Sequence, residues 1–229
     1  MMPVVEGKSL EQRVADDGPL PAVEILRVGM QIASGLAAAH AQGLVHRDIK
    51  PANILLEKGV ERVMVTDFGL ARAADDANMT RSGVIAGTPQ YMSPEQARGK
   101  DVDHRSDLFS LGSVLYFMCA GRPPFRAETM MGVLSRIAND KPRALRKINA
   151  EIPVWLQAII DRLLDKDREH RFQSASEVAG LLEECRAHVQ QPADVPLPAS
   201  LATQSSGRRF FSISRRAAGV ITMVAAFGF

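Results

Sequence analysis

The chain has little cysteine, no strong excess of charge of either sign and no leader-like start. Its two cysteines, Cys119 and Cys185, lie 66 positions apart in no metal-ligand pattern. This argues against a disulfide scaffold or a zinc site, and favours buried apolar thiols in a reducing compartment. The formal net charge of +2 provides no broad basic surface for nucleic acid. Residues 1–10 have neither a basic region nor an apolar core, so we expect no signal peptide.

The composition favours one compact, mainly helical unit. With 46% hydrophobic and 24% charged residues, the chain can bury a sizeable core. Ser9 is placed to cap a short helix that carries Leu10 and Val14. Further helices are predicted at residues 22–41, 104–119, 128–138, 153–164 and 174–189, and short strands at 44–45, 54–56 and 63–65. Residues 73–92 show no sustained period, which predicts a long loop that is functional or disordered.

The composition changes after residue 190. Residues 191–216 begin rich in Pro, Ala, Ser and Gln and end in a basic stretch, which predicts a linker with a juxtamembrane segment. Its arginines are at positions 208, 209, 215 and 216. Residues 217–229 carry no charge but are fewer than the ~18–20 needed to span a bilayer, so we interpret them as the start of a truncated membrane helix. The preceding arginines then indicate a cytoplasmic position for residues 1–190. An apolar end without a membrane role is the alternative.

Two short motifs form the strongest chemical signal. Residues 46–53 read H-R-D-I-K-P-A-N, and D-F-G follows at residues 67–69. Phosphoryl transfer needs an aligned nucleophile and cations that neutralise charge on the phosphate oxygens. Asp48 can accept the proton of a substrate hydroxyl, and Lys50 can reach the transferring phosphate as a point charge.

Asn53 and Asp67 supply the hard oxygen ligands that Mg²⁺ prefers. Taken in order, the two motifs resemble the catalytic and magnesium loops of the eukaryotic-type protein kinases. The resemblance implies that Asp48 is the catalytic base, that Lys50 contacts the phosphate of ATP, and that Asn53 and Asp67 hold Mg²⁺. A charged loop and a turn that contain these residues by chance are the alternative.

The chain downstream resembles the same family. G-T-P-Q-Y-M-S-P-E at residues 87–95 resembles the end of a kinase activation segment, with Ser93 where Ala is more usual. The resemblance implies that Glu95 forms a buried ion pair with Arg171 and that Asp107 braces the backbone of the catalytic loop. For Asp107, a solvated carboxylate at the start of a helix is the alternative.

The type of hydroxyl that would be phosphorylated is indicated by two residues. Lys50 and Thr88 resemble the serine/threonine branch of the family, and Thr88 is interpreted as positioning the substrate. Arg47 implies a site for a phosphate on the activation segment, bound through charge-assisted hydrogen bonds. Thr80 and Ser82 lie in that segment and are candidate phosphorylation sites, with ordinary loop hydroxyls as the alternative.

Residues 2–187 as a whole resemble the bacterial serine/threonine kinases. Residues 2–10 resemble the hinge that joins the two kinase lobes. By this resemblance the backbone of Val5 would face adenine, and Leu55 and Thr66 would lie under the nucleotide. Together with the phosphate and metal ligands named above, these residues form the expected ATP site.

The sequence contains neither the G-x-G-x-x-G loop nor the V-A-I-K strand that the resemblance would call for. We therefore expect residues 1–190 to be the C-terminal lobe and hinge end of a kinase domain without its first lobe. The expected fold is mainly α (α+β), with a small β-hairpin at the cleft. The surface near Leu55 and Phe68, which would face the first lobe, is expected to form an exposed apolar patch.

The implied reaction is transfer of the ATP γ-phosphate to a protein serine or threonine, with ATP and Mg²⁺ as cofactors. The implied location is a cytoplasmic kinase lobe anchored to the bacterial inner membrane. The expected partners are protein substrates, and a first lobe or a homodimer partner that completes the site. The chain alone is expected to be nearly inactive. A non-catalytic scaffold with a kinase-like lobe is the alternative, although the intact set of candidate catalytic residues argues against it.

Overall fold

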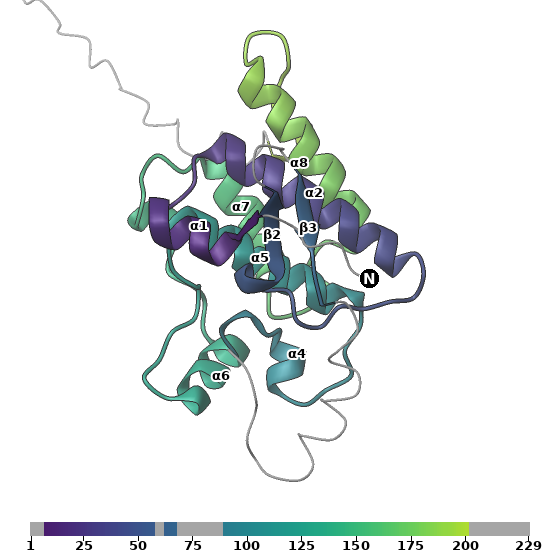
Figure 1. Cartoon of the computed structure of the whole chain (residues 1–229), viewed down its shortest axis with the longest axis vertical. Coiled ribbons are helices and arrows are strands. Elements are labelled where there is room, and N and C mark those ends of the chain that lie inside the picture. The colour runs from purple at the N-terminus through teal and green to yellow at the C-terminus, as the bar shows by residue number, and fades with distance from the viewer. Residues whose placement is uncertain (1–6, 58–61, 68–88, 202–229) are drawn as a thin grey trace, which may run out of the picture.

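The computed structural model describes residues 7–57, 62–67 and 89–201. Within these residues the chain is mainly helical, with one small sheet, as the sequence predicts (Figure 1). The elements in order are β1 (Gly7–Ser9), α1 (Leu10–Asp17), α2 (Ala22–His40), η1 (Pro51–Asn53), β2 (Ile54–Glu57), β3 (Val63–Val65), η2 (Pro89–Tyr91), α4 (Pro94–Ala97), α5 (His104–Ala120), α6 (Met130–Asn139), η3 (Leu145–Lys147), α7 (Val154–Leu163) and α8 (Ala175–Gln190).

Side-chain caps fix the starts of several helices. The Ser9 hydroxyl accepts a hydrogen bond from the backbone N–H of Gln12, and the Gln12 side chain accepts one from the backbone N–H of Ser9. Helix α1 therefore begins in a capping box. Asp103 caps α5 in the same manner, through the N–H of Arg105. At the other end of α5, Gly121 has a left-handed conformation (φ 66°), which a glycine adopts without steric cost.

The sheet is three-stranded and antiparallel, in the order β1-β2-β3. Ile54 of β2 pairs with Val65 of β3, so that the two strands form the expected hairpin. Ser9 of β1 pairs with Leu55 on the other side of β2. The sequence does not predict β1, because Gly7, Lys8 and Ser9 include none of the β-branched or aromatic residues typical of strands.

The strand predicted at residues 44–45 is wrong. This segment is not part of the sheet, and Leu44 is half exposed. The next two backbone N–H groups, of His46 and Arg47, donate to a carboxylate of α5 instead of to a neighbouring strand. A two-residue apolar run carries no information on which partner its backbone will find.

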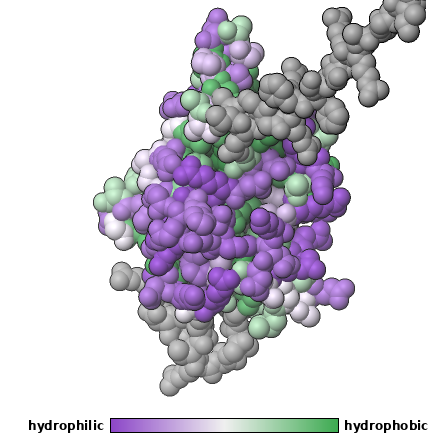
Figure 2. Space-filling model, turned by 180° about the vertical axis from the view of Figure 1, so that it is seen from behind, coloured by the Kyte–Doolittle hydropathy of each residue, from purple (hydrophilic) through white to green (hydrophobic). Residues whose placement is uncertain are grey.

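The core lies where α2 and α8 pack against each other and α2 packs against α5. Helix α5 is buried along its whole length from Ser106 to Cys119. Cys119 and Cys185 are both free and fully buried, and burial raises the pKa of each thiol to about 12. They therefore act as small apolar core groups, as the sequence predicts. The face shown in Figure 2 is largely hydrophilic, as expected for side chains that cover such a core.

Among the helices of the described residues, only α2 is long and apolar enough to cross a membrane. It is a core helix, because Ile25, Ile32 and Leu36 on its inner face are fully buried against the rest of the body. It therefore gives no support for a membrane span. Residues 217–229, where the sequence predicts a membrane helix, lie outside the described residues.

The first part of the predicted linker lies against the body. Leu201 is 5% exposed and belongs to the core cluster, and Leu197 packs beside it. A ring nitrogen of His188, near the end of α8, lies 2.6 Å from the carbonyl oxygen of Val195, which fixes the turn after the helix. The boundaries of the linker and of the predicted domains stay predictions.

Two glycines provide a matched test of this packing. A Cβ added to Gly112 of α5 would come within 2.7 Å of the Cβ of Leu163, whereas a Cβ added to Gly180 of α8 would meet nothing within 4 Å. We expect Gly112→Ala to lower the free energy of unfolding by about 1–3 kcal/mol through overpacking. Gly180→Ala should raise it by about 0.5–1 kcal/mol, because alanine loses less backbone entropy in a helix. Urea denaturation measures both, and equal effects at the two positions would contradict the packing.

Candidate active site

A buried carboxylate from α5 holds the loop that begins at His46. Asp107 is 1% exposed, and it accepts hydrogen bonds from the backbone N–H groups of His46 (2.9 Å) and Arg47 (2.8 Å). The Nε2 atom of His40, the last residue of α2, lies 2.8 Å from the same carboxylate. Arg47 has a left-handed backbone (φ 67°), which is uncommon for a non-glycine residue. The contact expected for Asp107 is present, and the alternative of a solvated carboxylate is excluded.

Three polar side chains gather just after this anchored turn. The Oδ2 atom of Asp48 accepts hydrogen bonds from the Nζ of Lys50 (2.6 Å) and from the Nδ2 of Asn53 (3.1 Å). Asn53 also donates to the backbone carbonyl of Asp48 at 2.9 Å, which closes the loop across η1. The side chain of Asp48 is 46% exposed, so a hydroxyl group of another molecule can reach it.

The β2–β3 hairpin brings Thr66 next to this cluster of side chains. The backbone N–H of Thr66 and its hydroxyl both donate to the carbonyl oxygen of Asn53, at 2.9 and 3.2 Å. The ring Nε2 of His46 lies 2.9 Å from the carbonyl oxygen of Thr66. Asp67 is the next residue, exposed and with a left-handed backbone (φ 64°). The end of β3 is therefore fixed beside the start of β2, and the two candidate metal ligands are on adjoining chain segments.

The chemistry of Asn53 and Asp67 fits a magnesium ion. Both hydrogen bonds of the Asn53 amide nitrogen go to Asp48, which leaves its amide oxygen as the atom available to a cation. Asp67 adds an exposed carboxylate. Among the described residues, no group of three or more His, Cys, Asp or Glu side chains is arranged to hold a metal ion. A site with few protein ligands, all of them hard oxygen donors, suits Mg²⁺, because this ion retains waters and binds phosphates.

The residues expected under the nucleotide lie on the hairpin next to this cluster. Leu55 is half-buried in the central strand β2, and Thr66 follows β3. The end of the expected hinge, β1, pairs with β2 at Leu55, which brings hinge and hairpin into one sheet. The exposed apolar patch expected near Leu55 and Phe68 stays a prediction, because Phe68 lies outside the described residues. Val5, Thr80, Ser82 and Thr88 lie outside them as well, and their roles stay predictions.

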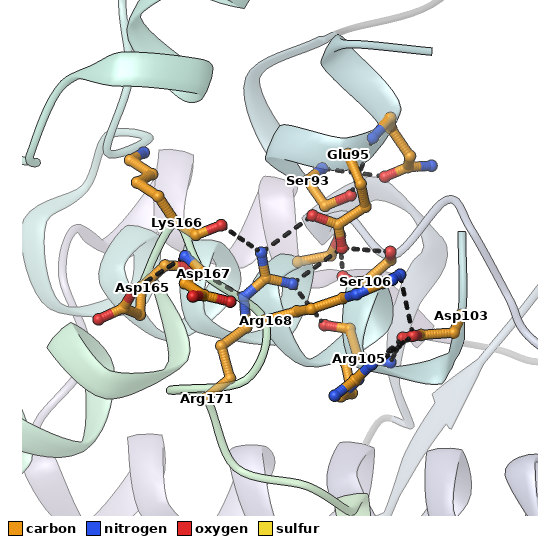
Figure 3. A network of polar contacts seen from close by, with 12 residues as sticks. Ser93, Glu95, Asp103, Arg105, Ser106, Asp165, Lys166, Asp167, Arg168 and Arg171 are labelled. Carbon is orange, nitrogen blue, oxygen red and sulfur yellow. Dashed lines mark hydrogen bonds and ion pairs between the residues drawn. The ribbon is translucent and has the colours of Figure 1, made fainter. Parts of the chain in front are cut away.

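A second polar cluster forms below the loop, around one ion pair (Figure 3). The Oε1 and Oε2 atoms of Glu95 accept bonds from the Nη1 and Nη2 of Arg171, at 2.8 and 2.9 Å. Both residues are buried, and the hydroxyl of Ser106 donates to the same carboxylate. Burial raises the pKa of Glu95, but the hydrogen bond and charge of Arg171 and the Ser106 hydroxyl outweigh it, so the pKa lies below its ordinary value of 4.5.

The remaining donors of Arg171 are also bound. Its guanidinium donates to the backbone carbonyls of Asp165 (2.8 Å), Arg105 (3.0 Å) and Lys166 (3.4 Å), as Figure 3 shows. This arginine therefore joins α4, α5 and the turn before α8 at one point. The ion pair implied by the family resemblance is present, with the bidentate geometry that makes such pairs strong.

Sequence reasoning missed two residues that connect these clusters. The side chain of Gln96, the next residue after Glu95, donates to the carbonyl oxygen of Arg47 at 2.7 Å. It also completes a capping box with Ser93, which the S-P-E-Q pattern could have indicated. His40 contacts Asp107 across the fold, and no local pattern marks a histidine at a helix end as such a partner.

The comparisons with known proteins agree with this geometry. The family model described as protein kinase domain matches residues 1–182. The chain is 39% identical over 187 residues to a probable serine/threonine-protein kinase of Clostridium perfringens, and 37% identical over 220 residues to the serine/threonine-protein kinase PknB of Mycobacterium leprae. These matches cover 81% and 94% of this chain, but the chain spans only 27% and 35% of the length of these curated relatives.

A solved structure is similar as well. Rad53 residues 1–466, in complex with AMP-PNP, matches with a TM-score of 0.65 and 27% sequence identity. The match covers 77% of this chain and 44% of that one.

The buried ion pair predicts how the stability of the fold depends on pH. Glu95→Gln leaves the charge of Arg171 buried without its counterion, so we expect a loss of about 3–5 kcal/mol in the free energy of unfolding at neutral pH. Because the pKa of Glu95 is lowered on folding, its contribution is complete above pH 4.5 and is lost as pH falls through the lowered value. The difference between parent and variant should therefore shrink in acid, as followed by urea denaturation at several pH values.

Glu169→Gln is the matched control. It breaks the 2.9 Å ion pair of Glu169 with Arg105, in which the glutamate side chain is 64% exposed. Exposed pairs contribute little, so we expect a loss below about 1 kcal/mol. If both variants lost the same stability, or if the Glu95 effect did not depend on pH, the buried pair would not have the role assigned to it.

Proposed function

This chain belongs to the protein kinase family, and from that membership we propose that it is the catalytic lobe of a bacterial serine/threonine protein kinase. Its relatives are named serine/threonine kinases, and the fold is that of a kinase. The observation that most supports catalysis is the convergence of Lys50 and Asn53 on the carboxylate of Asp48. A scaffold protein would not need these three side chains in contact.

The proposed reaction moves the γ-phosphoryl group of ATP to a protein serine or threonine. The hydroxyl oxygen forms a new bond to the γ-phosphorus, the bond from this phosphorus to the bridging oxygen breaks, and ADP leaves. Asp48 takes the proton of the hydroxyl group, for which its half-exposed carboxylate is accessible. Lys50 places its charge next to the reacting oxygens, and Thr88 positions the substrate.

Asn53 and Asp67 are the proposed ligands of Mg²⁺. When bound, the cation neutralises negative charge on the phosphates. The chain's own contribution is to fix these two ligands on the hairpin, through the bonds of Thr66 to the Asn53 carbonyl. The proposed adenine contacts are the backbone of Val5 and the side chains of Leu55 and Thr66.

The proposed regulation and location rest on the family and the sequence. Arg47 would bind a phosphate on Thr80 or Ser82 and so order the segment that leads to Glu95. The lobe would lie in the cytoplasm and be anchored to the bacterial inner membrane by a helix of which residues 217–229 would be the start. The site would be completed by a first kinase lobe or by a homodimer partner.

Asp48→Asn tests the catalytic proposal. Removal of a general base lowers the rate by about 10²–10⁴-fold, so transfer of labelled phosphate from ATP to a protein acceptor should fall by this factor. Since the sequence has no Gly-rich loop, we expect slow turnover from the 229 residues and faster turnover after fusion to a first lobe from another serine/threonine kinase. Asp194→Asn, an exposed change in the turn after α8, is the control that should retain full turnover.

Two outcomes would contradict different parts of the proposal. Fast turnover by the 229 residues alone, abolished by Asp48→Asn, would support Asp48 as the base but contradict the need for a first lobe. A folded chimaera that binds ATP but transfers no phosphate above the level of its Asp48→Asn variant would instead support the non-catalytic scaffold.

A further inference from the structure

A hollow lined with arginines shares no lining residue with the candidate active site. Its volume is about 760 Å³, and it is formed by the end of α5, the loop of residues 122–129, part of α6 and the segment before η3. We call it the arginine hollow. Its polar lining residues are Tyr116, Arg122, Arg126, Glu128, Thr129, Arg136 and Arg143.

Three of these arginines have no carboxylate partner within the described part of the chain. Arg122 is half-buried and Arg126 and Arg143 are exposed, and none of the three forms an ion pair found there. Unpaired guanidinium groups that face one space repel each other and present several planar donors to it. The lining therefore favours an anionic occupant.

The fourth arginine is held in place. The side chain of Arg136 donates to the carbonyl oxygen of Arg126 at 2.8 Å and lies 3.9 Å from Asp140. It fixes the backbone of the loop against α6, so that this wall of the hollow does not depend on an occupant.

Tyr116 fixes the opposite wall. It is 3% exposed, and its hydroxyl donates to the carbonyl oxygen of Arg143 at 2.9 Å. Burial raises the pKa of Tyr116, the charges of Arg122 and Arg143 lower it, and the charge of Asp161 raises it. Both arginines are thus close to one buried ring at the end of α5. Pro123 and Pro124, which also line the hollow, restrict the backbone between them and α6.

We propose that the arginine hollow binds a phosphorylated or acidic segment of a protein that docks on the kinase lobe. The lining holds four arginines and one glutamate, Glu128, and Asp140 lies near only Arg136, so the hollow keeps an excess of positive charge. Its volume is in the range of sites that hold several chemical groups, and is larger than one phosphate needs. A stretch of peptide with more than one anionic side chain fits both properties. The site goes beyond the proposed function, because binding there requires no catalysis.

The test measures peptide binding to the full 229-residue chain by fluorescence anisotropy. The probes are a labelled alanine-rich peptide with phosphoserines, and the same peptide with glutamates or with serines in their place. We expect binding in the order phosphoserine, glutamate, serine, and weaker binding as salt is added. The double variant Arg122→Gln, Arg143→Gln should bind the phosphopeptide at least about tenfold more weakly, since each loses charge-assisted hydrogen bonds.

Two matched variants sharpen the test. Arg146→Gln removes an exposed arginine three residues from Arg143 that does not line the hollow, and should leave binding unchanged. Glu128→Gln removes the one negative charge of the lining and should tighten binding by about two- to threefold. Asp48→Asn should also leave peptide binding unchanged, so that failure of this site and failure of phosphotransfer are measured separately.

Three results would overturn the proposal. The first is unchanged binding by the double variant, with circular dichroism showing that it is folded. The second is an equal loss in Arg146→Gln, which would mean that the peptide binds any positive surface. The third is displacement of the phosphopeptide by inorganic phosphate at the same concentration, which would assign the hollow to the free ion.

Discussion

The buried carboxylate of Asp107 is the contact on which the candidate active site depends. It receives two successive backbone N–H groups, of His46 and Arg47, and the ring of His40. The two backbone N–H groups come from a loop that has no place in the sheet, so without the carboxylate they would be left unpaired. The left-handed backbone at Arg47 turns the chain so that Asp48 faces Lys50 and Asn53. The conformational cost at this residue is of order 1–3 kcal/mol, and the surrounding hydrogen bonds offset it.

One turn of α5 organises both polar clusters. Ser106 and Asp107 are adjacent and buried, but they bind different parts of the chain: Ser106 binds the carboxylate of Glu95, and Asp107 binds the loop at His46. Gln96 connects the two clusters directly, because it follows Glu95 and donates to the carbonyl of Arg47. Helix α4 and the loop that carries Asp48 are therefore positioned by the same rigid helix. Such shared support is what a site that must hold several groups in fixed relative positions requires.

The sequence predicts the parts of this structure that depend on periodic patterns or on local capping. The helices α2 and α5 follow from apolar spacing, and α1 follows from Ser9. The hairpin of β2 and β3 also follows from apolar runs, but the short strand β1 and the failed strand at residues 44–45 do not, because their partners are distant in sequence. His40 and Gln96 were missed for the same reason: each contact joins residues about fifty or more positions apart. The candidate catalytic residues were found through the resemblance, and their roles stay predictions.

The central claim is that Asn53 and Asp67 hold one nucleotide-bound cation beside the carboxylate of Asp48. The most direct measurement is paramagnetic broadening of backbone amide NMR signals by Mn²⁺ with ATP, because Mn²⁺ replaces Mg²⁺ at oxygen ligands. The account predicts that the signals of Asn53, Thr66 and Asp67 broaden first, and that those of α7 stay sharp. Broadening spread evenly over surface carboxylates, with these three signals unaffected by Mn²⁺ and ATP, would contradict it.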